Sequence, residues 1–223
     1  MRKYFFLLAI FLISATYNAM AQTEKGKNQV GGTLSYSSSN SSLTGQITNG
    51  KSKALELSPS YGHFFADNLV VGLSVSYSRQ KQSNSLNGIY IGSVYYPSAP
   101  YGSEQTLNYF LAGPYIRYYT KIAENFKFFA QFNAYAGFGN SKFVEEYPNT
   151  TQSSKNKGFG GALTPGFAFF PAKKWAIEFG FNLISYSKNK TENSMGLYTD
   201  QTAENLNLGF NSFSSLIGIN YHF

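Results

Sequence analysis

The chain has 223 residues and no cysteine, and its 18 lysines and arginines outnumber its 11 acidic residues, giving a formal net charge of +7. The absence of cysteine excludes disulfides, a lipid anchor on an N-terminal cysteine, thiolate metal sites and cysteine nucleophiles. A basic chain can bind nucleic acid, but here the lysines are spread among strand ends and loops. We therefore expect contact with anionic lipid head groups and no nucleic-acid partner.

The N-terminus has the pattern of a cleavable signal peptide. Arg2 and Lys3 precede an apolar stretch over 4–13, and Ala19-Met20-Ala21 offers small residues for cleavage after Ala21. The apolar stretch is shorter than the roughly 20 residues of a spanning helix, which disfavours the alternative of an uncleaved anchor. We expect a signal peptide over 1–21 and one exported domain over 22–223.

The exported part is predicted to be all-β. Aromatic residues make up 18% of the chain and charged residues only 13%, against roughly a quarter in ordinary proteins. Because no later apolar run is long enough for a spanning helix, the apolar residues must alternate with small or polar ones, as they do in strands. Eight such segments follow one another, beginning near Val30, Leu55, Leu69, Phe110, Phe126, Phe159, Trp175 and Phe213.

Each segment has one face of Phe, Leu, Val, Ile and Tyr and one face of Gly, Ser, Asn and Thr with isolated charges. The segments reach the 9–11 residues of a membrane-spanning strand. Aromatic residues near the ends of these segments, including Phe64, Tyr119 and Phe170, are expected in girdles at the membrane interface.

Two irregularities interrupt the alternation. Pro59, Pro114 and Pro165 fall on the apolar face of their strands, and we attribute them to β-bulges, since proline cannot donate to a ladder. In the last segment Leu206, Leu208 and Phe210 have the opposite parity to the residues after Phe213. We expect a bulge or a change of environment near Ser212.

The connections alternate regularly in length. Short turns fall near 65–68, 121–125 and 171–174, and long polar loops cover 40–51, 82–104, 146–156 and 190–203. This order predicts an eight-stranded antiparallel up-and-down transmembrane β-barrel, with the short turns and both termini on the periplasmic side and the long loops outside. The terminal strand presents Ile217, Ile219, Tyr221 and Phe223 on one face. This row is similar to the signal that the barrel assembly machinery reads.

Two segments carry a family resemblance. Residues 58–68, with the sequence SPSYGHFFADN, and residues 113–119, with GPYIRYY, resemble the outer membrane protein beta-barrel domain family of Gram-negative bacteria. That family is related in architecture to OmpX and to the OmpA transmembrane domain, and the resemblance covers roughly 28–223. It implies an integral protein of the outer membrane and carries no information about activity.

The lumen of an eight-stranded barrel is just wide enough to be filled by side chains, which argues against a general porin. Arg117, Lys127 and Glu178 have inward parity and lie near the short turns. Because unpaired charges there would be costly, we expect an internal cluster of these three residues. A self-neutralising plug is the favoured interpretation, and a proton or ion relay is the alternative. Inward glycines are expected to make room for facing Tyr and Phe rings.

The sequence offers no support for catalysis, a cofactor or a metal. Its two histidines, His63 and His222, both belong at the periplasmic rim, away from the serines of the external loops. Acyl hydrolysis would need a histidine beside such a serine, with an acid to orient it. Two separated histidines and scattered carboxylates also do not form a metal ligand set.

The loop over 82–104 is the best candidate for surface contact. Tyr90, Tyr95, Tyr96 and Tyr101 stand there among Gly, Ser and Pro. Tyrosine offers a large contact area with a polar tip, which suits binding of a surface partner. The alternative, left open by the sequence, is that these residues extend the flanking strands into a hairpin and pack on each other.

The sequence therefore predicts a non-enzymatic, outer-membrane-integral barrel with a filled lumen and four long external loops, in a structural or surface-interaction role. The main alternative is a soluble exported barrel of the lipocalin kind, with the apolar faces turned inward around a hydrophobic ligand. A lipid-modifying enzyme of the outer membrane is a third alternative. The small, sparsely charged second face favours the membrane protein, because it fills a narrow lumen better than it covers a solvated exterior.

Overall fold

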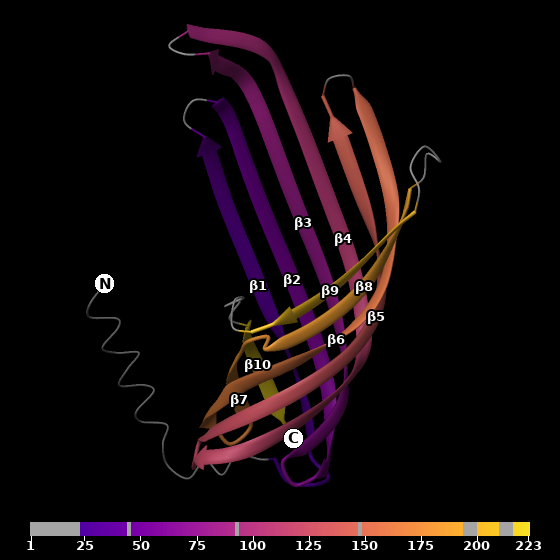
Figure 1. The fold of residues 1–223 in the computed structure, drawn as a ribbon. Coiled ribbons are helices and arrows are strands. Elements are labelled where there is room, and N and C mark those ends of the chain that lie inside the picture. Colours follow the sequence, from indigo (N-terminus) through magenta and orange to yellow (C-terminus); the bar gives the residue numbers. More distant parts are fainter. Residues whose placement is uncertain (1–22, 44–45, 92–93, 147–148, 194–199, 210–215) are drawn as a thin grey trace, which may run out of the picture.

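The computed structural model describes residues 23–43, 46–91, 94–146, 149–193, 200–209 and 216–223. Within these ranges the chain forms ten strands in a single antiparallel sheet (Figure 1). No helix in this part of the chain is long and apolar enough to cross a membrane. The expected signal peptide over 1–21 and the expected irregularity at Ser212 lie outside the described residues.

The strands differ widely in length. They are β1 (Asn28–Leu43), β2 (Gln46–Ala66), β3 (Leu69–Ile91), β4 (Val94–Ala123), β5 (Phe126–Glu145), β6 (Thr150–Ala172), β7 (Trp175–Gly180), β8 (Ile184–Asn193), β9 (Gln201–Leu208) and β10 (Leu216–His222). Short turns at 67–68, 124–125 and 173–174 mark one end of the sheet, which we call the turn end. The opposite end, beyond which β1–β4 extend in Figure 1, is the hairpin end.

At the turn end the sheet closes into a ring of eight strands, β1-β2-β3-β4-β5-β6-β7-β10. The closing contact pairs Gln29–Thr33 of β1 with residues 222–218 of β10. β7 and β8 are two parts of the seventh strand, and β9 and β10 are two parts of the eighth. The predicted eight-stranded antiparallel barrel is therefore confirmed.

The seventh strand changes parity between its two parts. Trp175, Ile177 and Phe179 are exposed in β7, whereas Ile184 and Tyr186 are exposed in β8. The register confirms the shift, because Gly166 pairs with Gly180 but Leu163 pairs with Ile184, which leaves one extra residue in the seventh strand. β9 follows β8, with Leu206 opposite Tyr186. The unusual parity of Leu206 and Leu208 thus continues a shift that begins one strand earlier.

The expected bulges at the prolines are wrong for two of the three. Pro59 pairs with Gly32 and Pro114 pairs with Leu73, and the register is the same on both sides of each proline. In a strand, the N–H of a residue points to only one of the two neighbouring strands. A proline, which has no N–H, therefore removes a single ladder hydrogen bond and does not require an inserted residue. At Pro165 the irregularity lies in the adjacent strand, where the Phe181 N–H donates to the Pro165 carbonyl at 3.1 Å.

The exterior of the barrel is apolar. Large hydrophobic side chains with more than about a third of their surface exposed occur on every strand, in the alternating positions that the sequence predicts. Leu73 is 64% exposed and Phe138 is 62% exposed, values that a soluble protein would not repeat on all sides. The lipocalin alternative, which needs these faces turned inward, is therefore wrong.

The turn end is filled by a compact aromatic layer. Phe64, Tyr119 and Phe170 are fully buried inside the ring, together with His222. Their expected place in an interfacial girdle is wrong, because each has the inward parity of its strand near a turn where the register shifts. Glycines make the room: a Cβ at Gly72 would lie 2.6 Å from the Tyr115 ring. The expectation that lumen glycines face aromatic rings is confirmed.

Among the described residues, the ladders do not close the barrel wall at the hairpin end. Above Thr33, the residues of β1 pair with β2 alone. β9 pairs with β8 alone. Within the described residues, no ladder therefore joins the first and last strands at this height, and β1–β6 rise together above the closed ring (Figure 1).

Candidate functional site

The lumen near the turn end contains one buried ion pair. Arg117 projects inward from β4 and Glu178 from β7, and Arg117 Nη1 lies 2.6 Å from Glu178 Oε1 and 2.8 Å from Oε2. Both side chains are less than a tenth exposed. The pair joins strands on different sides of the ring, so it holds the lumen closed across its width.

Further hydrogen bonds fix the geometry of the pair. Arg117 Nε donates to Gln131 Oε1 at 2.6 Å, and Arg117 Nη1 donates to the Tyr119 hydroxyl at 2.8 Å. The Tyr119 hydroxyl also lies 3.1 Å from oxygens of Glu178 and Gln29. The Arg117 guanidinium is 4.4 Å from the centre of the Phe129 ring, a cation–π distance. Each charge therefore has several partners, as a buried ion needs.

Lys127 does not complete the expected three-residue cluster. Its ammonium donates to Thr23 Oγ1 in the N-terminal segment and, at 3.0 Å, to Asn68 Oδ1 in the turn between β2 and β3. The segment 23–27 lies across this turn, with the Asn68 N–H donating to the Thr23 carbonyl at 2.6 Å. Lys127 thus anchors the N-terminal segment beneath the aromatic layer, while Arg117 and Glu178 form a pair without it.

A cavity of about 370 Å³ lies above the ion pair. Arg117, Glu178 and Phe129 line it together with small and polar side chains from all around the ring. Glu56, the remaining inward acid, accepts hydrogen bonds there from Ser58 and Ser76 at 3.2 and 3.3 Å. The lumen therefore has a polar, partly open upper part and a lower part that side chains fill.

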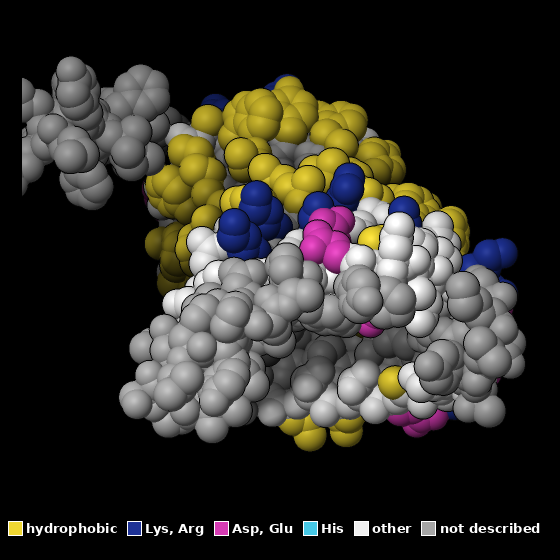
Figure 2. Space-filling model, turned by 90° about the horizontal axis from the view of Figure 1, so that it is seen from above, with side chains coloured by type: hydrophobic (Ala, Val, Ile, Leu, Met, Phe, Trp, Pro, Cys, Tyr) yellow, Lys and Arg dark blue, Asp and Glu magenta, His cyan; other side chains and the backbone are white. Residues whose placement is uncertain are grey.

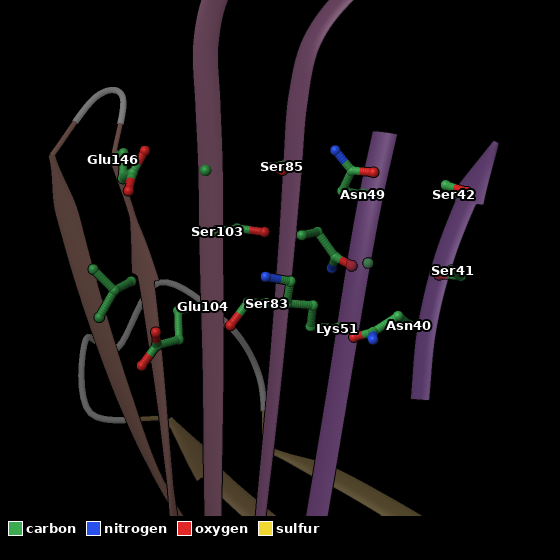
Figure 3. A pocket seen from close by; sticks show the side chains of 14 residues that line it. Asn40, Ser41, Ser42, Asn49, Lys51, Ser83, Ser85, Ser103, Glu104 and Glu146 are labelled. Atoms are coloured by element: carbon green, nitrogen blue, oxygen red, sulfur yellow. The ribbon is translucent and has the colours of Figure 1, made fainter. Parts of the chain in front are cut away.

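The hairpin end contains a larger hollow, which we call the vestibule. It has a volume of about 850 Å³ and is lined by Asn40, Ser41, Ser42, Asn49, Gly50, Lys51, Ser83, Asn84, Ser85, Gly102, Ser103, Glu104, Val144 and Glu146. The labelled side chains come from β1 to β4 and from the residue after β5, and they are mostly hydroxyls and amides, with two carboxylates and the ammonium of Lys51 (Figure 3). Such a lining suits a polar, hydrogen-bonding ligand better than an apolar one.

The tyrosines predicted for surface contact lie beyond the vestibule. Their backbones form the tip of the β3–β4 hairpin, where Tyr90 pairs with Tyr95, Tyr96 with Ile89, and Tyr101 with Leu86. The structure therefore has the strand extension that the sequence left open. The side chains of 86–101 lie outside the described residues, so their contact role stays a prediction.

The remaining predicted residues have simple positions. Ile217, Ile219 and Phe223 are exposed on the exterior, each by 44% or more, and Tyr221 stacks on Phe223 in the same row. His63 Nδ1 lies 2.9 Å from Asn28 Oδ1 at the turn end, and His222 is buried against Phe170. In the described part of the chain no three His, Asp or Glu residues gather into a candidate metal site.

Sequence analysis missed the polar partners of the ion pair and the whole vestibule. Gln29 and Tyr115 have the inward parity that would have placed them in the lumen, and Gln29 Nε2 donates to the Tyr115 hydroxyl at 2.9 Å. The vestibule depends on strands that pass far beyond the apolar band, as at Ser41, Ser83 and Ser103. Their Ser- and Asn-rich composition is that of loops, so no sequence signal marks them as strand.

We predict that Glu178→Gln lowers the free energy of unfolding by about 3 kcal/mol, because it leaves the Arg117 guanidinium buried without a counter-charge. The double variant Arg117→Met, Glu178→Leu should be less destabilised than Glu178→Gln. Urea unfolding of detergent-refolded protein, followed by the fluorescence of the single tryptophan, Trp175, measures the free energy of unfolding of both variants.

The matched control is Lys81→Gln, Glu104→Gln, which removes an ion pair at 2.7 Å whose side chains are each 44% exposed. Its loss should lower the free energy of unfolding by less than about 1 kcal/mol. Equal losses for the buried and exposed pairs would contradict this account.

Comparison with known proteins agrees with the barrel geometry. The model of the family described as "Outer membrane protein beta-barrel domain" matches residues 5–223. Solved structures similar to the chain include Ail of Yersinia pestis, with 14% identity, 89% of this chain and 99% of Ail covered, and a TM-score of 0.34. Ail in complex with the heparin analogue sucrose octasulfate gives 15% identity, the same coverage and a TM-score of 0.38.

A third similar structure is OprG of Pseudomonas aeruginosa, with 13% identity, 92% of this chain and 99% of OprG covered, and a TM-score of 0.48. No curated protein matches the chain. The family match extends over nearly the whole sequence, including all ten strands. The chain therefore belongs to the outer membrane protein beta-barrel domain family and is an integral protein of the Gram-negative outer membrane.

Proposed function

We propose that this outer-membrane barrel acts by surface contact: β1–β4 present a polar vestibule outside the cell, and the barrel neither conducts ions nor catalyses a reaction. The observation that carries the proposal is the contrast between the two ends of the lumen. Side chains fill the turn end, whereas a polar hollow of about 850 Å³ opens at the hairpin end.

The filled turn end supports the absence of conduction. Phe64, Tyr119 and Phe170 occupy the ring beneath the Arg117–Glu178 pair, and the segment 23–27 lies below them. An ion would have to displace a buried ion pair held by several hydrogen bonds and then an aromatic layer. Both displacements are costly, because they expose apolar area and leave charges unpaired.

The chemistry of the hairpin end supports contact over catalysis. The vestibule offers hydroxyls, amides and the carboxylates of Glu104 and Glu146. Both histidines of the chain are at the opposite end of the barrel. The serines of the vestibule therefore have no histidine to activate them, and the favoured partner is a polar molecule that binds by hydrogen bonds.

The barrel assembly machinery is proposed to recognise one exterior row of the last strand, formed by Ile217, Ile219, Tyr221 and Phe223. Its members lie on one face of β10 and at its end, exposed on the exterior beside the strand that pairs with β1. The tyrosines of the β3–β4 hairpin tip are proposed to extend the contact surface of the vestibule.

Purified protein in a planar lipid bilayer should show no stepwise conductance. The variant Tyr119→Ala, Phe129→Ala removes two rings that fill the lower lumen and should raise the ion leak, whereas Tyr77→Ala on the exterior should not. A steady channel in the unmodified protein would contradict the sealed lumen.

Single cysteines test the orientation, since the chain has none of its own. In intact cells a membrane-impermeant maleimide should label Ser41→Cys and Ser103→Cys of the vestibule. It should label Asp67→Cys and Lys173→Cys at the turns only after lysis. The reverse labelling pattern would place the vestibule in the periplasm and contradict the proposed surface role.

A further inference from the structure

An apolar groove lies on the exterior of the barrel, outside the lumen and the vestibule. It has a volume of about 770 Å³ and extends from β4 across β5 and β6 to β8 and β9. The small side chains Ala112 and Ala136 are cross-strand partners in it, and the Phe110 and Phe138 rings, 5.7 Å apart, stand directly above them. Phe159 pairs with Ala136 on the other side. The groove exists because two alanines interrupt an otherwise bulky row.

Lysines line the same groove on its hairpin side. Lys157 is the cross-strand partner of Phe138, Lys188 is the partner of Phe159, and Lys190 is the partner of Lys157. The exterior therefore changes from aromatic to cationic within one step of the ladder. Seen from above, Lys and Arg side chains lie along the border where the hydrophobic exterior ends (Figure 2). This border is where lipid head groups meet the barrel.

The lysines are only partly neutralised. Lys188 is 2.6 Å from Glu204 and Lys190 is 2.8 Å from Asp200. Glu192 is shared between Lys157 and Lys190 at 3.5 and 3.6 Å, longer than the 2.7–2.9 Å of a charge-assisted hydrogen bond. Lys142 and Lys155 are exposed on the same side of β5 and β6. Five lysines thus face three carboxylates, and Lys157 is free to reach a stronger anion than Glu192.

We propose that this groove is a binding site for one phosphorylated lipid of the outer leaflet, with an acyl chain on Ala112 and Ala136 and a phosphate on Lys157 and Lys190. The groove supplies the apolar surface that an acyl chain needs, and the lysines supply the complementary charge at the height of a head group. A neutral lipid would use the groove alone and leave the excess positive charge uncompensated. The site depends on the membrane location of the barrel and not on the proposed surface partner.

Native mass spectrometry of detergent-purified protein with added diphosphoryl lipid A tests the site. The unmodified protein should retain one lipid molecule. Lys157→Gln, Lys190→Gln should weaken retention about tenfold, because charge-assisted contacts are lost. Ala136→Leu, which fills the groove and keeps every charge, should weaken it comparably. Phosphatidylethanolamine, whose own ammonium offsets its single phosphate, should not be retained above the level of the Lys157→Gln, Lys190→Gln variant.

The matched control is Lys53→Gln, Lys81→Gln, which removes an exposed lysine from β2 and a half-buried one from β3 on another side of the barrel. This variant should retain lipid A like the unmodified protein. A heat-dependent shift in gel mobility confirms that each variant is folded. Equal retention by all folded variants, or a loss in the Lys157→Gln, Lys190→Gln variant without a loss in Ala136→Leu, would overturn the site.

Discussion

The rest of the structure depends on backbone hydrogen bonding at the closing seam between β1 and β10. In a membrane every N–H and C=O must find a partner, so a sheet can span it only when its first and last strands pair. Here Gln29–Thr33 and β10 supply that pairing at the turn end. Closure then forces alternate side chains into a narrow lumen, and aromatic rings and one ion pair fill its lower part.

Strand parity and loop length were sufficient to predict the eight-stranded barrel from the sequence. Parity works because one face meets lipid and the other meets the lumen, so a row such as Leu69–Tyr77 must alternate. Parity also placed Arg117 and Glu178 inside. It could not show that Lys127 lies apart from them, because depth along the barrel axis depends on strand tilt and stagger, which leave no local signal.

The wrong predictions concern the buried aromatic rings and two of the prolines, and the vestibule and the lipid groove were not predicted at all. Phe64, Tyr119 and Phe170 were assigned to a girdle because they are close to the turns, although each has the inward parity of its own strand. Bulges were assigned to Pro59 and Pro114 because the sequence does not show that a lost ladder bond can be tolerated in place. The vestibule and the lipid groove each combine residues of several strands that lie at the same height along the barrel axis. In the groove these include Ala112, Ala136 and Phe159, and only the ladder registers show that they are neighbours.

The most direct test of this account is a disulfide across the closing seam. Val30 and Tyr221 are cross-strand partners on the exterior, close enough for a disulfide after substitution. The chain has no cysteine of its own, so any disulfide must form between the introduced residues. On oxidation in outer-membrane fractions, the double variant Val30→Cys, Tyr221→Cys should cross-link, and the double variant Val30→Cys, Ile217→Cys should not. Cross-linking of the first pair is the result that a closed ring in this register predicts. No cross-link there, or one with Ile217→Cys instead, would contradict the register on which the sealed lumen rests.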